Sequence, residues 1–243
     1  LFAGHTDTVF PAGTDLTVHE ENGCYRCPGI NDDTRAVAEL LSIARAMKAN
    51  GIHGEGDIVF CANVCEEGLG DLKGVKYIFE NPNDYDGFVS IDNPVTGGIV
   101  YTATGSRRFR VTFRGPGGHS FADFGIPSPI HALGRAMSRI ADFQVPPMPK
   151  TTFNIGVIEE NASMLVDIRS DSPEELKRLS AELETAVRQA EQEENGRRPD
   201  GEGVKAEIEL VGNRPAGTQP KDCKIVRAAW TAAEMLGISP ELR

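Results

Sequence analysis

Residues 57–92 read DIVFCANVCEEGLGDLKGVKYIFENPNDYDGFVSID and contain two apolar runs with an amphipathic stretch between them. Residues 57–64 predict a buried strand, residues 72–80 a short helix, and residues 87–92 a second strand. A strand, a helix and another strand in succession are typical of a parallel sheet in an α/β domain. The fold class expected for this part of the chain is therefore α/β with a mostly parallel sheet.

The sequence before this stretch continues the pattern. Apolar residues recur at helical spacing over 36–47 and stop before Gly51, which predicts an amphipathic helix with a glycine cap at its end. Residues 1–3 are expected to end a buried strand. The dipeptide Asn22-Gly23, with strand signals on both sides, predicts a hairpin that leaves the sheet. Strand and helix signals thus alternate over the first hundred residues.

The order of elements changes after residue 104. The remaining signals give the order β-α-β-β-α-β, with elements expected at 107–114, 128–143, 151–158, 164–169, from 172 onward, and at 204–211. This order is that of a ferredoxin-like α+β domain, the split βαβ pattern. A last helical segment, 222–236, resumes the style of the first domain. We therefore expect a discontinuous domain, residues 1–104 and 215–243, into which a domain of residues 105–214 is inserted.

Composition excludes several classes of function. The chain has 243 residues, with 36 acidic and 25 basic side chains and a formal charge of −11. Such a charge repels phosphate backbones and anionic lipid surfaces, so we expect no nucleic-acid partner and no membrane partner. No apolar run reaches the roughly 18 residues of a membrane-spanning helix. The five cysteines have no disulfide-like rhythm, which favours a reducing, cytoplasmic location.

Acidic or histidine side chains follow four successive elements of the first domain. They are His5 and Asp7 after the first strand, Asp32 and Asp33 before the helix at 36–47, Glu66 and Glu67 after the strand at 57–64, and Asp92 at the end of the strand at 87–92. Taken singly, each is explained by a polar contact in a turn or by a helix cap. One helix needs a single N-cap residue, however, so one of the two aspartates is left over.

These side chains are expected to lie close together. In open α/β sheets ligands bind outside the carboxyl ends of the strands, which is where His5, Glu67 and Asp92 fall. Clustered carboxylates repel one another unless a cation neutralises them, and carboxylates with an imidazole suit divalent metals. The pattern favours a metal site over a set of unrelated caps.

Two other motifs offer alternative sites. Cys24-x-x-Cys27 and Cys61-x-x-x-Cys65 have the ligand type of a four-cysteine zinc site, but a long segment with a helix separates the pairs, so buried free thiols are favoured. The glycine-rich segment 115–118 lacks the GK[ST] ending of a phosphate-binding loop. It places His119 in an exposed loop, where both a functional and a merely solvated histidine fit.

Five motifs together resemble those of the M20 metallopeptidase family, the di-zinc peptidases and N-acyl amino acid deacylases. The motifs are GHTDTVFP at 4–11, PGINDDTRAVA at 28–38, NVCEEGLGDLKG at 63–74, SID at 90–92 and GPGGHSF at 115–121. They occur in the family's order over nearly the whole chain, and GHTDTVFP is most similar to the di- and tripeptidase-like branch. The resemblance implies a zinc-dependent hydrolase with aminopeptidase-type activity.

The resemblance also implies a role for each matching residue. For the two zinc ions, His5 and Asp92 are similar to ligands of the first, Glu67 to a ligand of the second, and Asp32 to the carboxylate that bridges both. For catalysis, Asp7 is similar to the carboxylate that orients the His5 imidazole, Glu66 to the general base, and His119 to a lid-domain histidine that reaches the substrate of a partner subunit. Residues 105–214 would then form a lid and dimerisation domain of a homodimer.

Three functions remain open from the sequence. The first is hydrolysis of an amide bond in short peptides by a zinc-activated water, and the second is deacylation of N-acyl amino acids, which uses the same residues. The third is a metal-binding homologue without catalysis, since none of His19, His53 and His131 matches the family's last zinc ligand. We expect that ligand in a segment beyond Arg243, and further family sequence before Leu1.

Overall fold

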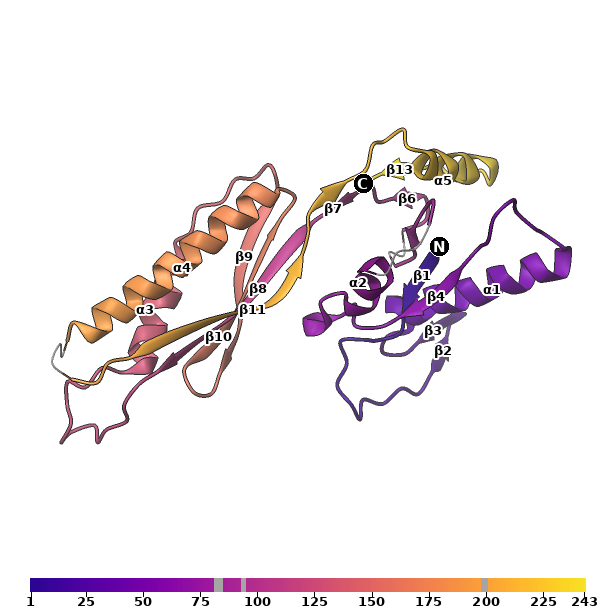
Figure 1. Ribbon diagram of the computed structural model, residues 1–243. Helices are drawn as coiled ribbons and strands as arrows, with labels where there is room; N and C mark the ends of the chain where they lie inside the picture. The colour runs from indigo at the N-terminus through magenta and orange to yellow at the C-terminus, as the bar shows by residue number, and fades with distance from the viewer. Residues whose placement is uncertain (81–84, 93–94, 198–200) are drawn as a thin grey trace. The chain divides into compact units, whose positions relative to one another are not determined.

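A three-stranded parallel sheet organises the first part of the chain (Figure 1). The computed structural model describes residues 1–80, 85–92, 95–197 and 201–243, and in it β1 (Phe2–His5) lies between β4 (Phe60–Asn63) and β5 (Val89–Ser90). Both pairs are parallel. Because parallel strands end at the same edge of a sheet, the residues that follow these three strands share that edge.

Helix α1 (Arg35–Asn50) packs beside β1 and buries Ala36 and Leu40. Gly51 ends the helix in the left-handed region, at φ 61°, and donates its N–H to the carbonyl of Lys48. The predicted helix and its glycine cap are therefore confirmed. Helix α2 (Lys73–Glu80) also forms where the sequence predicts it.

The predicted hairpin is formed by β2 (His19–Glu21) and β3 (Cys24–Arg26). Asn22 and Gly23 have φ of 53° and 74°, as a type I′ turn requires. Pairing of the two strands ends at His19 opposite Arg26, before Pro28, which has no N–H to donate.

The remaining strands and helix of this part lie close to residue 100 and in the last 20 or so residues of the chain. Parallel pairing joins β6 (Gly98–Ile99) to β13 (Glu241–Leu242), and α5 (Lys224–Met235) precedes Gly237, which has φ 72°. Two single turns, Ile30–Thr34 and Gly68–Gly70, complete the described elements. Among the described helices, none is both long and apolar enough to cross a bilayer.

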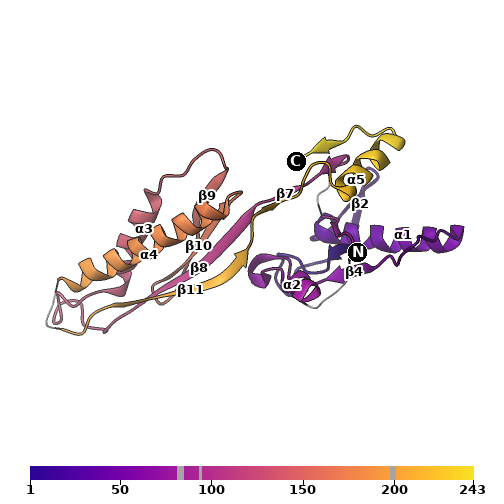
Figure 2. The same cartoon turned by 45° about the horizontal axis from the view of Figure 1, so that its top comes forward.

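The second part of the chain has the expected order β-α-β-β-α-β. Its elements are β8 (Gly105–Arg114), α3 (Pro129–Ala141), β9 (Thr151–Glu159), β10 (Ser163–Ser170), α4 (Pro173–Asn195) and β11 (Lys205–Arg214). The strands form one sheet in the order β11-β8-β10-β9, and every neighbouring pair is antiparallel. Helices α3 and α4 lie on the same face of this sheet (Figures 1 and 2).

The core of this second part lies between the sheet and its two helices. Alternate residues of β8 point into it, Phe109, Val111 and Phe113, as the predicted strand pattern requires. Helix α4 contributes a buried stripe at helical spacing, which includes Leu179 and Leu183. Both helices begin at a serine N-cap followed by proline, as predicted.

Internal contacts divide the described residues into a first unit, 1–101 with 220–243, and a second unit, 102–219. The second unit extends beyond the limits drawn from the sequence, 105 and 214. The extension contains β7 (Thr102–Ala103) and β12 (Gly217–Thr218), which pair with each other and were too short to predict.

The mixed α/β architecture is confirmed. Over the described residues most strand pairs are antiparallel, so mostly parallel pairing is wrong for the chain as a whole. It holds for the sheet of the first unit, the part of the chain for which it was expected. Parallel pairing is confined to the sheet of β1, β4 and β5 and to β6 with β13. The strand-helix-strand signal gives strands of only two to four residues here, whereas the antiparallel strands β8 and β11 have 10 residues each.

Candidate metal centre

His5 lies at the carboxyl end of β1 and is 3% exposed. Its Nδ1 is 2.9 Å from the main-chain oxygen of Asp7, so the ring proton on Nδ1 is donated to that carbonyl. Its Nε2 is 3.0 Å from Oδ1 of Asp32 but makes no hydrogen bond. Two lone pairs that face each other at this distance repel unless a cation lies between them, so the arrangement fits a metal ion.

Asp7 joins the ends of β1 and β4. Its carboxylate accepts the N–H groups of Glu66 at 3.1 Å and Glu67 at 2.9 Å. Burial by itself would raise the pKa of Asp7, but these two hydrogen bonds outweigh it and lower the pKa. The carboxylate is 3.6 Å from Nδ1 of His5, whereas the main-chain carbonyl of Asp7 makes the shorter contact with the ring.

Asp33 is 1% exposed and contacts the main chain of His5. Its Oδ2 accepts the main-chain N–H of His5 at 3.0 Å, and the N–H of Ala36 also contacts this carboxylate. Burial raises its pKa. Gly4 permits this approach, because a Cβ on Gly4 would be 3.1 Å from Oδ2 of Asp33. Asp33 thus contacts both the first turn of α1 and the end of β1.

Asp32 precedes Asp33 through a cis peptide bond and has φ −127°, outside the helical region. One possible ligand atom each from His5, Asp32 and Asp92 lies within 4.8 Å of the others. The same holds for His5, Glu66 and Glu67. His5 therefore belongs to two groups that have the size and the chemistry of a metal site.

The electrostatics of the two groups favour a bound cation. Burial, followed by the negative charge of Asp32, raises the pKa of Glu67 and of Asp92. The pKa of His5 is raised as well: burial lowers it, but the hydrogen bond to Asp7 and the carboxylates of Asp33, Glu66 and Asp92 outweigh burial. Mutual repulsion of the carboxylates thus adds to burial in Glu67 and Asp92, and the same carboxylates raise the pKa of His5. A divalent cation would neutralise this excess of negative charge.

Two residues of this region were not singled out from the sequence. Arg35, the first residue of α1, donates from Nη2 to the main-chain oxygen of Asp92 at 3.3 Å and brings a positive charge to the carboxylates. Asn63 ends β4 and is 6% exposed, and its Oδ1 has no hydrogen-bond partner. Its place as the polar residue at the carboxyl end of a predicted strand is a signal that could have identified it.

His119 belongs to the second unit and lies in a turn after β8. The structure therefore does not place it relative to the residues of the first unit. The rival cysteine site finds no support: all five cysteines are free thiols, and neither candidate metal group among the described residues contains one.

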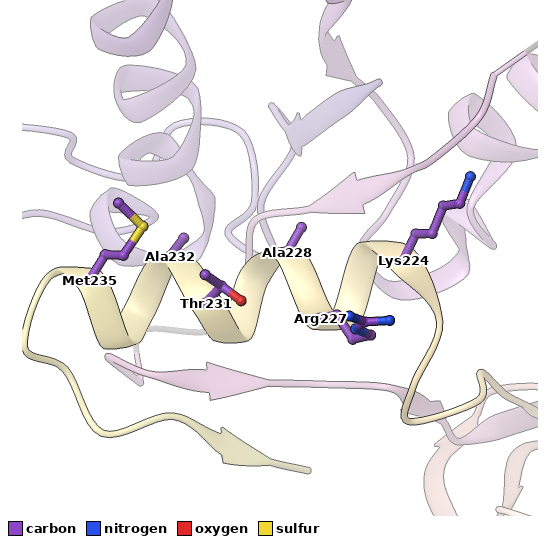
Figure 3. Close-up of a pocket in the computed structure, with 6 residues that line it drawn as sticks. All are labelled: Lys224, Arg227, Ala228, Thr231, Ala232 and Met235. Carbon is purple, nitrogen blue, oxygen red and sulfur yellow. The ribbon is translucent and has the colours of Figure 1, made fainter.

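A shallow depression on α5 is a separate hollow of the first unit (Figure 3). It is lined by Lys224, Arg227, Ala228, Thr231, Ala232 and Met235. None of these is a carboxylate, histidine or cysteine, so the lining offers no metal ligand of the usual kinds. The chemistry of the first unit is concentrated at the carboxyl ends of β1, β4 and β5.

Comparison with known proteins agrees with this geometry. The profile of Peptidase family M20/M25/M40 matches residues 1–243. The chain belongs to this family. The family resemblance inferred from the sequence is thereby confirmed. Of the residues singled out by that resemblance, the structure brings together His5, Asp32 and Asp92 in one group and His5, Glu66 and Glu67 in another. A comparison with curated protein sequences finds no significant match.

Solved M20 structures show the same fold. A tripeptidase from Staphylococcus aureus has a TM-score of 0.74 at 23% identity and is aligned over 99% of this chain and 65% of its own. For aminopeptidase PepT from Bacillus cereus the TM-score is 0.68 at 22% identity, over 100% and 65% of the two chains. For the dipeptidase Dug1p from Saccharomyces cerevisiae it is 0.70 at 18% identity, over 99% and 66%. The present chain thus spans about two thirds of the length of each of these relatives.

Proposed function

We propose that this protein hydrolyses an amide bond in short peptides with the help of two zinc ions. The observation that carries the proposal is the buried Nε2 of His5, which faces the carboxylate of Asp32 without a hydrogen bond. His5 is also the residue that both candidate metal groups contain. Membership of a peptidase family supports it. The structural relatives include an aminopeptidase, a tripeptidase and a dipeptidase, which favours peptides over N-acyl amino acids as substrates.

Four side chains would hold the metal ions in this proposal. His5 and Asp92 hold the first metal, Glu67 the second, and Asp32 both. Carboxylates and a neutral imidazole are ligands that zinc accepts. The Nδ1–H of His5 is donated to Asp7, which leaves the Nε2 lone pair for the metal. When bound, the two cations supply Lewis acidity that makes water nucleophilic near neutral pH.

Glu66 is the general base of the proposed reaction. It takes a proton from the attacking water and returns it to the leaving amine, so the amide C–N bond breaks with no covalent link to the protein. Its main-chain N–H is held by Asp7, which fixes the segment that carries it next to β1. The difference in role between Glu66 and its neighbour Glu67 rests on the family resemblance.

His119 supplies a hydrogen bond to the developing oxyanion. In this proposal the second unit forms a homodimer, and His119 of one subunit acts on substrate bound at the metal centre of its partner. The second unit thereby acts as lid and dimerisation domain.

The roles of Glu66 and Asp32 are tested by separate variants of the full-length protein. Glu66→Gln should keep both zinc ions and lower turnover of di- and tripeptides by roughly 10²- to 10⁴-fold, the usual contribution of a general base. Asp32→Ala should lose zinc and activity together, because it removes a ligand common to both metals. Zinc is measured by elemental analysis and turnover by release of amino acids.

Two results would contradict the proposal. Loss of zinc in Glu66→Gln would make Glu66 a ligand rather than a base. A zinc-loaded wild type that cleaves N-acetyl amino acids but no peptide would favour a deacylase instead.

A further inference from the structure

His119 begins a turn that folds back on its own side chain. The main-chain N–H groups of Phe121 and Ala122 both point at Nδ1 of His119, at 3.3 and 3.1 Å. A main-chain N–H can only donate, so Nδ1 is an acceptor and carries no proton. The proton of the neutral imidazole is therefore on Nε2, and the ring offers a hydrogen-bond donor on the side away from the turn.

Asp123 closes this turn through two contacts with His119. Its Oδ2 accepts the main-chain N–H of His119 at 2.8 Å, and its own N–H is donated to the carbonyl of His119 at 3.0 Å. Gly118 leaves the space for this, because a Cβ there would lie 3.0 Å from Cβ of Asp123. The carboxylate and the glycine together bring the chain back on itself within five residues.

Apolar packing does not account for the shape of the turn. Phe121 and Phe124 are the large apolar residues between His119 and Gly125, and they are 88% and 83% exposed. Side chains in solvent to this extent give a turn little stability. The hydrogen bonds to Asp123 and to Nδ1 are thus what orders the turn.

We propose that Asp123 is a positioning residue for His119. It holds the turn in which two main-chain N–H groups occupy Nδ1, and so keeps the proton of the neutral imidazole on Nε2 and orients Nε2–H as a donor. This inference rests on the proposed function for the role of His119 in turnover, while the state of the ring is a property of the turn alone. A donor that is already oriented suits an oxyanion or a carbonyl oxygen and does not suit a general base.

The state of the ring is tested by nitrogen NMR on the full-length protein labelled with ¹⁵N-histidine, at about pH 8, where histidine is neutral. The His119 signals are identified by their loss in His119→Gln. Wild type should show an unprotonated Nδ1 and a protonated Nε2. In Asp123→Ala the two shifts should move toward each other as the tautomers interconvert. A protonated Nδ1 in wild type would overturn the proposal. So would ¹⁵N shifts in Asp123→Ala that do not differ from those of wild type.

Activity provides the second measurement. Asp123→Ala should lower kcat by about 10-fold with little change in KM, less than the roughly 10²- to 10³-fold loss expected when the donor itself is removed in His119→Ala. Asp123→Asn keeps a carbonyl acceptor and should restore most of kcat. Glu184→Ala, which removes an exposed carboxylate on α4, is the matched control and should have no effect.

These measurements separate the two levels of inference. Wild-type turnover in His119→Ala would contradict the proposed function, and the NMR result would still decide the role of Asp123. An inactive His119→Ala together with wild-type kcat and wild-type shifts in Asp123→Ala would leave the proposed function intact and refute the positioning role.

Discussion

At the scale of single residues, His5 shows how burial and hydrogen bonds prepare a side chain to bind metal. Nδ1 donates to the carbonyl of Asp7, the main-chain N–H is held by Asp33, and Nε2 has no hydrogen-bond partner. A buried polar atom without a partner is costly, and a bound cation would remove the cost. The tautomer is thus fixed by a contact on the opposite side of the ring.

Glu194 is a second buried charged residue, and it lies in the second unit. It is 0% exposed, accepts the N–H of Ser128 at 2.9 Å and that of Arg135 Nε at 3.1 Å, and has Arg197 and His131 nearby. Burial alone would raise its pKa, but these partners outweigh burial and lower it from 4.5. Its charge therefore stabilises the link between the end of α4 and the start of α3.

Glu194→Gln should lower the free energy of unfolding of the second unit by about 1–3 kcal/mol at neutral pH, since it keeps the acceptor for Ser128 but removes the charge opposite Arg135. Because the pKa is lower in the folded protein, the charge of Glu194 stabilises the wild type at pH values above the unfolded-state pKa. This stabilisation is lost as the pH falls through the folded-state pKa. The difference between the two proteins should therefore shrink between about pH 5 and pH 2.

Denaturant unfolding followed by helical circular dichroism measures this difference. Fluorescence of Trp230 is an internal control, because the second unit contains no tryptophan or tyrosine. A difference that stays constant with pH would show that the charge of Glu194 is not responsible.

At the scale of elements, the ends of strands and helices carry most of the specific contacts. The three parallel strands end at one edge, and the segments that follow them bring Asp7, Glu66, Glu67 and Asp92 to His5. Helix α4 begins with Ser172, whose Oγ accepts the N–H of Glu175 at 3.2 Å. The reciprocal hydrogen bond of a capping box, from the N–H of Ser172 to Glu175, is absent, because the N–H of Ser172 is donated to Oγ of Ser170.

Ser172→Ala should destabilise the second unit by about 1 kcal/mol, because it leaves the N–H of Glu175 without its cap. Ser172→Asn supplies another side-chain oxygen at the N-cap and should recover most of the loss. Hydrogen exchange of the amides in the first turn of α4 detects the change directly. Equal protection of these amides in wild type and Ser172→Ala would show that the cap contributes nothing.

At the scale of the whole molecule, the proposed action of His119 on a partner subunit predicts that two inactive variants restore activity when mixed. A site built from one chain does not predict this. Consider a mixed dimer of one Glu66→Ala chain and one His119→Ala chain. One of its sites carries both lesions and the other carries neither. Random re-association of equal amounts makes about half of the dimers mixed, so activity should return to about a quarter of wild type.

Each variant alone, measured in the same assay, should be nearly inactive. Subunit exchange is verified independently with a size-tagged copy of one variant. If His119 served its own chain, each site of the mixed dimer would carry one lesion and no activity would return. Verified exchange without recovery would therefore refute the action of His119 on a partner subunit.

The sequence by itself determined the order of elements and the identity of the candidate site residues. Alternation in β8, helical spacing in α1 and α4, the Asn22-Gly23 turn and the Gly51 cap are local signals, and each acts through residues next to it in the chain. Carboxylates at the ends of predicted strands pointed to the candidate metal centre for the same reason, since the direction of a parallel strand fixes where its end lies.

Only the tertiary structure decided which atoms meet. The carbonyl rather than the carboxylate of Asp7 makes the short contact with His5, Asp33 reaches back to β1, and Arg35 contacts Asp92. Strand pairing also depends on residues far apart in sequence, such as those of β8 and β11, which pair antiparallel. Local propensity cannot specify these contacts, since their partners are brought together by packing of the whole unit.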